Sequence, residues 1–108
     1  MMRVLIACEY SGTVRDAFIK RGHDAMSCDL LPTESPGTHY QGDVFDVIGD
    51  GWDLMIAHPP CTYLSNAGAR HLYPNGLLNQ DRFSLGLEAK DFFMKLWATD
   101  IPKICIEN

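Results

Sequence analysis

Short, uninterrupted apolar runs alternate with helical patterns along this 108-residue chain, and this alternation most constrains its fold. Apolar runs bounded by turn signals are typical of buried strands. They predict strands at residues 3–8, 25–30, 52–57 and 102–108. Apolar residues spaced three and four apart predict helices at 13–21 and 83–99.

Strands that are apolar throughout and alternate with helices predict a parallel sheet covered on both faces. We therefore expect an α/β fold, a Rossmann-like doubly wound parallel sheet with helices on both faces, in a single domain over residues 1–108. Residues 31–41, rich in Pro, Gly, Ser and Thr, are predicted as loop, and residues 43–48 fit either a strand end or a short helical turn. The apolar stripe of the second helix is expected in the core: Leu87, Phe92, Phe93, Leu96 and Trp97.

Charge and cysteine content narrow the function classes. The formal charge of −5 gives no general attraction to a phosphate backbone. Four cysteines without a C-x-x-C pair fit neither a disulfide framework nor a zinc site, and the four histidines show no ligand spacing. No apolar run is long enough to span a bilayer. We expect a cytoplasmic protein with reduced thiols, no metal and no membrane contact.

Polar residues follow the predicted strands, where parallel α/β sheets bind ligands. Tyr10 fits either stacking on an adenine or covering the edge of the core. Asp29 and Asp43 fit either ribose binding or ordinary turn and cap roles. The residues gathered at strand ends are Glu9, Tyr10, Ser11, Asp29, Asp43, Pro60, Cys61, Glu107 and Asn108.

Cys61 follows two prolines, Pro59 and Pro60, in a loop whose backbone they restrict. A free cysteine is commonly inert packing, yet a thiol at the mouth of a ligand crevice fits a nucleophile. Glu107 fits either a solvated strand end or an acid facing that crevice. His58 fits a base or hydrogen-bond donor, or a structural histidine.

The order of these motifs resembles the DNA (cytosine-5) methyltransferase family, and is closest to its short phage-type members. Residues 57–68, AHPPCTYLSNAG, are similar to that family's catalytic loop G-F-P-C-Q-x-F-S-x-x-G at Pro60, Cys61, Ser65 and Gly68. Glu107-Asn108 resembles the family's E-N-V. Thr62 replaces the usual glutamine, and Pro59 replaces the phenylalanine.

The cofactor motifs resemble the same family. Tyr10-Ser11-Gly12 is similar to F-x-G-x-G-G, with one glycine retained, and Asp29 matches the acid that closes the second strand. Gly42-Asp43 matches the G-D of the third, and Asp81-Arg82 is similar to the D-x-R that opens the next helix. The resemblance implies S-adenosylmethionine as cofactor, bound by Tyr10, Ser11, Gly12, Asp29, Leu30, Asp43, Val44 and Pro60.

The resemblance implies an enzyme that methylates carbon 5 of a cytosine flipped out of DNA. Cys61 would attack ring carbon 6, Glu107 would assist at ring nitrogen 3, and Asn108 would hold the catalytic loop. Pro59 and Ser65 would contact the substrate.

The matched motifs belong to the cofactor and catalytic half of such enzymes, without the target-recognition region and C-terminal motifs. That leaves an apolar edge expected to favour a homodimer. The alternative is a non-catalytic module, derived from such an enzyme, that binds S-adenosylmethionine, a nucleotide or a partner. Methylation of a free nucleotide is a third reading, because it needs no recognition region.

Overall fold

The computed structural model describes residues 1–59 and 80–107, and describes only the backbone of residues 80–86. These form two compact units. The first contains residues 1–58 and 99–107, and the second contains residues 59–98 and 108. The first unit holds the sheet. Its elements are β1 (Arg3–Ala7), α1 (Thr13–Lys20), β2 (Asp24–Asp29), β3 (His39–Gln41), the 3-10 helix η1 (Val44–Asp46), β4 (Leu54–Ala57) and β5 (Lys103–Ile106).

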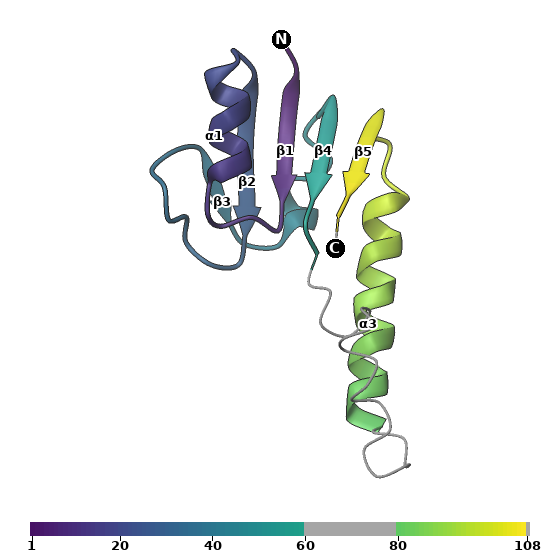
Figure 1. Ribbon diagram of the computed structural model, residues 1–108. Coiled ribbons are helices and arrows are strands. Elements are labelled where there is room, and N and C mark those ends of the chain that lie inside the picture. Colours follow the sequence, from purple (N-terminus) through teal and green to yellow (C-terminus); the bar gives the residue numbers. More distant parts are fainter. Residues whose placement is uncertain (60–79, 108) are drawn as a thin grey trace. The chain divides into compact units, whose positions relative to one another are not determined.

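All strand pairs in the sheet are parallel, and the strand order is β3-β2-β1-β4-β5 (Figure 1). The chain proceeds outward in one direction from β1 to β3, then returns to the other side of β1 with β4. The order therefore reverses between β1 and β4, which is where open α/β sheets bind ligands. The predicted α/β class and parallel sheet are confirmed, and the topology is compatible with a Rossmann-like fold.

The core of this unit lies between α1 and the central strands. Val4, Ile6 and Ala25 are buried on the face toward α1, where Val14 and Phe18 of the helix pack against them. These strand residues alternate with others that point to the opposite face, as the two-residue period of a strand requires. The opposite face is also buried at Leu5, Ala7, Met55 and Ala57.

The segment predicted as loop over residues 31–41 contains a strand. β3 pairs with β2 over three residues, with Cys28 opposite Tyr40. Its sequence, His-Tyr-Gln, has no apolar run, because β3 is a short edge strand with partly exposed side chains. The undecided segment 43–48 begins with η1, whose first turn is capped by the Asp43 side chain accepting a hydrogen bond from the Phe45 N–H at 2.9 Å.

The second unit contains α3 (Gln80–Trp97). The prediction that its whole apolar stripe is core is wrong: Leu87 and Trp97 are more than half exposed, whereas Leu96 is buried. At 100° per residue, Leu87, Met94 and Trp97 share one side of the helix and Leu96 lies on the other. The apolar residues therefore surround the helix. Within the part of the chain that the structure describes, no helix combines the length and apolarity that crossing a bilayer requires.

Candidate functional site

A pocket of about 400 Å³ opens beside the carboxyl ends of β1 and β4, at the reversal of strand order. Its volume lies within the range of about 300–1,000 Å³ that small-molecule sites occupy. The lining comes from the segment that joins β1 to α1, from the loop after β2 and from the end of β4. The lining residues are Cys8, Glu9, Tyr10, Ser11, Thr13, Val14, Glu34 and His58.

Glu9 caps the amino end of α1. Its carboxylate accepts hydrogen bonds from the backbone N–H groups of Val14, at 3.0 Å, and Arg15, at 3.2 Å, and its side chain is buried. These N–H groups have no partner within the helix, and they attract negative charge. Glu9 therefore holds the position that a phosphate takes in dinucleotide-binding folds.

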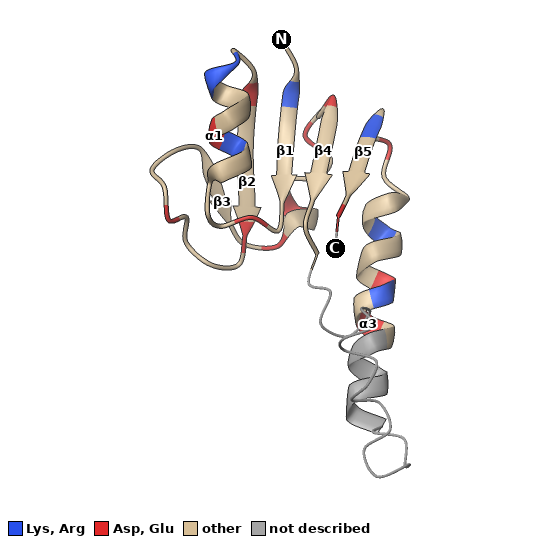
Figure 2. Cartoon of the chain, viewed as in Figure 1, with Lys and Arg blue, Asp and Glu red and all other residues tan. Residues whose placement is uncertain are grey.

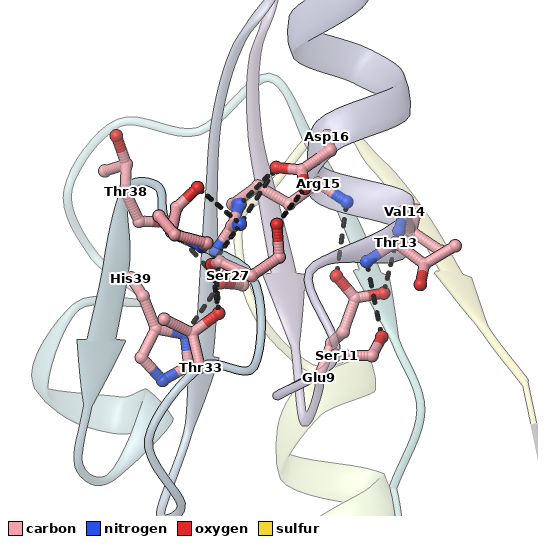
Figure 3. Close-up of polar contacts among 12 residues, drawn as sticks. Glu9, Ser11, Thr13, Val14, Arg15, Asp16, Ser27, Thr33, Thr38 and His39 are labelled. Atoms are coloured by element: carbon pink, nitrogen blue, oxygen red, sulfur yellow. Dashed lines mark hydrogen bonds and ion pairs between the residues drawn. The ribbon is translucent and has the colours of Figure 1, made fainter.

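Arg15 is fully buried and holds the loop after β2 against α1 and the sheet (Figure 3). Its Nη1 donates to Ser27 Oγ at 3.0 Å and to Thr33 Oγ1 at 3.1 Å, and its Nη2 donates to the Ser35 carbonyl at 2.8 Å. Its Nε donates to Asp16 Oδ1 at 2.9 Å. The hydrogen bond from Arg15, with another from Ser35, lowers the pKa of the Asp16 carboxyl. One guanidinium thus satisfies acceptors from a helix, a strand and a loop.

His39 completes this network from β3. Its Nε2 lies 3.0 Å from the Leu31 carbonyl, which only accepts, so Nε2 carries the proton. Its Nδ1, 2.7 Å from Ser27 Oγ, then accepts from the serine hydroxyl. The loop is fixed at both of its ends.

The backbone of the loop also bonds directly to the segment after β1. The Glu34 N–H donates to the Tyr10 carbonyl at 2.8 Å, and the Glu34 side chain lines the pocket. Neither Glu34 nor the Arg15 network was predicted as part of the site, because the loop sequence shows only turn-forming residues. Burial of an arginine beneath that loop carries no sequence signal of its own.

Three predicted cofactor residues lie in the segment after β1. Tyr10, 43% exposed, and Ser11 line the pocket. Gly12 adopts a left-handed backbone conformation (φ 82°) as the residue before α1. A Cβ there would lie 2.6 Å from Arg15 Nη2 and 2.9 Å from Ser35 Cβ. Internal packing alone therefore requires glycine at this position.

The other predicted cofactor residues lie at the ends of β2 and β3, and none of them lines the pocket. Asp29 accepts a hydrogen bond from the Leu31 N–H at 2.9 Å, and Asp43 caps η1, so each has a local structural role. Leu30 is 74% exposed and Val44 is buried. Both aspartates are nonetheless close enough to Cys8 to affect its thiol.

His58 and Glu107 meet at the ends of β4 and β5. The two strands pair Ala57 with Ile106, and the Glu107 N–H donates to the Ala57 carbonyl at 2.9 Å. The next residue on each strand therefore stands beside the other, and His58 Nε2 lies 3.8 Å from Glu107 Oε2. The Cys105 thiol lies 3.8 Å from the other carboxylate oxygen. His58 also lines the pocket, so it connects the pocket with the predicted catalytic glutamate.

Cys8 and Cys28 are protonated thiols. Burial, and then the negative charge of Asp29, raises the pKa of Cys8 to about 12 and that of Cys28 to about 11. Cys8 also has a left-handed backbone conformation (φ 61°), which residues with a side chain rarely adopt. Strain of this kind is concentrated at functional sites, but the protonated thiol is a poor nucleophile.

We expect iodoacetamide at pH 8 to alkylate the exposed Cys105 at least about ten-fold faster than Cys8 or Cys28, because only thiolates react. Peptide mass spectrometry against time gives the three rates. In urea the buried pair should become as reactive as Cys105. Equal rates in the folded protein would contradict the protonated, buried state of Cys8 and Cys28.

Four of the predicted site residues lie outside the described residues: Pro60, Cys61, Ser65 and Asn108. Pro59, predicted to contact the substrate, is buried directly after His58. The structure therefore brings together Tyr10, Ser11 and His58, and places Glu107 beside His58.

The sheet unit separates its charges (Figure 2). Carboxylates gather at the carboxyl ends of the strands, whereas Arg3, Lys20, Arg21 and Lys103 lie at the opposite ends of β1, α1 and β5. The pocket lining holds two glutamates and neither lysine nor arginine. Over residues 1–59 and 80–107, no group of three or more His, Cys, Asp or Glu side chains is arranged to hold a metal ion.

No protein-family model, curated protein or solved structure matches this chain. The assignment of a function therefore depends on the pocket and on the sequence motifs around it.

Proposed function

We propose that the chain binds S-adenosylmethionine in the pocket between the ends of β1 and β4, and uses it to methylate carbon 5 of cytosine in DNA. The sheet would then be part of the doubly wound methyltransferase fold. The observation that carries the proposal is the pocket itself, which lies at the reversal of strand order and contains Tyr10 and Ser11 of the motif that resembles a methyltransferase cofactor loop.

The charge of the pocket supports this cofactor over a phosphate-bearing nucleotide. Glu9 already accepts from the N–H groups at the start of α1, and its charge would repel a phosphate at that position. Glu34 adds a second negative charge. S-adenosylmethionine has no phosphate, and its sulfonium and ammonium groups leave it with a net positive charge. The residues present therefore fit this ligand.

The proposed chemistry takes the following form. S-adenosylmethionine, when bound, supplies an electrophilic methyl group. The Cys61 thiolate attacks ring carbon 6 of the flipped cytosine, which makes carbon 5 nucleophilic. Glu107 protonates or hydrogen-bonds ring nitrogen 3 and so stabilises the added negative charge. These roles for Cys61 and Glu107 follow from the resemblance, and the exposure of the Glu107 carboxylate at the strand end is consistent with substrate access.

Calorimetric titration tests the cofactor. We expect S-adenosylmethionine to bind about five-fold more tightly than neutral S-adenosylhomocysteine, the factor for one charge contact of ~1 kcal/mol in water-like surroundings, and ATP not to bind. Glu34→Gln should reduce this preference, whereas Asp50→Asn, the same charge change before β4, should not. Equal affinity for ATP, or no binding at millimolar ligand, would contradict the assignment.

A covalent trap tests the transfer reaction. DNA containing 5-fluorocytosine should form a stable adduct with the chain when S-adenosylmethionine is present, because fluorine cannot leave carbon 5 as a proton does. Cys61→Ser should abolish the adduct, and Cys105→Ser should retain it. Denaturing electrophoresis separates the adduct from the free chain.

A non-catalytic binding module is favoured by one observation, the acidic carboxyl edge of the sheet unit (Figure 2). That edge would repel the DNA backbone at low salt. Binding of S-adenosylmethionine without any adduct would support this alternative.

A further inference from the structure

His58 and Glu107 form a pair whose geometry follows from the backbone. Their neighbours Ala57 and Ile106 are paired in the β4–β5 ladder, and the facing side-chain atoms, His58 Nε2 and Glu107 Oε2, are 3.8 Å apart. The His58 N–H donates to the Ala7 carbonyl at 3.0 Å, so the imidazole is anchored to β1 as well. The His58 side chain is 31% exposed and that of Glu107 is 66% exposed, so both are accessible to a ligand.

We propose that His58 is a positioning residue that holds the proton delivered by Glu107 to the substrate ring. This inference rests on the proposed function, and it assigns His58 a role that the motif resemblance does not include. The imidazole is the one group in the pair whose ordinary pKa, about 6.5, keeps a proton available near neutral pH. A glutamate alone, with an ordinary pKa of about 4.3, is almost wholly ionised there.

The proton balance is simple. The Glu107 carboxyl gives one proton to ring nitrogen 3 as Cys61 adds to carbon 6, and the His58 imidazolium gives its Nε2 proton to the carboxylate. The positive charge passes from His58 to the ring, where it offsets the negative charge that the thiolate adds. No bond to carbon changes in this step, and the proton returns when Cys61 leaves.

The surroundings of the imidazole favour its charged form. Carboxylates stabilise an imidazolium, and the two thiols near the pair contribute weak polar contacts. The titratable groups that face His58 or its partner are Cys8, Glu9 and Tyr10 after β1, Glu34 in the loop after β2, and Cys105 and Glu107 on β5.

Nuclear magnetic resonance titration tests the pairing without any activity. In Glu107→Gln, the His58 ring should titrate at a pH about 0.3 to 0.7 lower than in the wild type, the range for a partly exposed ion pair. His23, whose ring accepts from the Met2 N–H away from the pocket, should be unaffected. An unchanged His58 midpoint would overturn the pairing.

The pH dependence of 5-fluorocytosine adduct formation tests the role. His58→Gln should slow the adduct by at least about ten-fold at pH 7, and the deficit should shrink as the pH falls and Glu107 protonates unaided. His23→Gln should follow the wild type at every pH. A deficit that is absent, or independent of pH, would overturn the role of His58. Absence of any wild-type adduct would instead overturn the transfer reaction and proton delivery with it, while the ring titration still decides the pairing.

Discussion

Arg15→Met is expected to lower the free energy of unfolding by about 3 to 5 kcal/mol, the cost of breaking a buried charged network by removing one partner. The side chain is 0% exposed, and its loss leaves acceptors on Thr33, Ser35 and Asp16 without their donor. A domain of this size is stable by roughly 5 to 15 kcal/mol. The variant should therefore be close to unfolding. Urea denaturation followed by circular dichroism measures the change.

Two companion variants separate the causes. Arg15→Lys keeps the charge but lacks the planar fork of donors, so it should lose much of the same stability. Arg21→Met removes an exposed arginine just after α1, and should change stability by no more than about 0.5 kcal/mol. An Arg15→Met denaturation midpoint equal to that of the wild type would show that the network contributes little.

Gly12→Ala should cost about 3 kcal/mol or more, because two penalties coincide at this residue. Its left-handed conformation costs an L residue roughly 1 to 2 kcal/mol. The new Cβ would also lie 2.6 Å from Arg15 Nη2, and overpacking of this kind costs about 1 to 3 kcal/mol. The same change should distort Ser11 and weaken binding of S-adenosylmethionine, which calorimetry measures.

Three other glycines separate these penalties. Gly22 has the left-handed conformation (φ 87°) with nothing near its would-be Cβ, so Gly22→Ala measures conformation alone. Gly37 would place a Cβ 2.7 Å from the Arg15 guanidinium, so Gly37→Ala measures the close contact alone. Gly49, with open space around it, should tolerate alanine. If Gly12→Ala costs no more than Gly22→Ala, the guanidinium yields easily and the contact argument is wrong.

The central strands could be predicted because burial on both faces is written into their sequence. Val4, Leu5 and Ile6 are consecutive apolar residues, and all three are buried. β3 could not be predicted in this way. It is an edge strand, so its three residues need only backbone pairing with β2, and any polar sequence supplies that.

The site was predicted in part. Tyr10 and Ser11 line the pocket as expected, because a turn that follows the first strand of such a sheet faces the reversal of strand order. Asp29 and Asp43 were left open between ligand binding and local capping, and the structure shows the capping contacts. Glu9 was noticed as a strand-end acid, but its hydrogen bonds to α1 depend on the path of residues 8–12, which a one-dimensional pattern does not contain.

His58 shows the limit most clearly. From the sequence it fits a structural residue as well as a functional one, and Glu107 is nearly fifty positions away along the chain. Their approach depends on β4 and β5 being neighbours in register. Only the strand order brings the two side chains together.

The anchoring of the loop after β2 has a consequence for how this pocket can change. Arg15 reaches a hydroxyl and a carbonyl at fixed places in that loop, and β3 then restarts in register with β2. Insertions or deletions between Leu31 and Thr38 would move these acceptors off the guanidinium. A side chain such as Glu34, which faces the pocket from this fixed frame, can be exchanged without moving it. New ligand preferences are therefore accessible here by substitution, while changes of loop length are not.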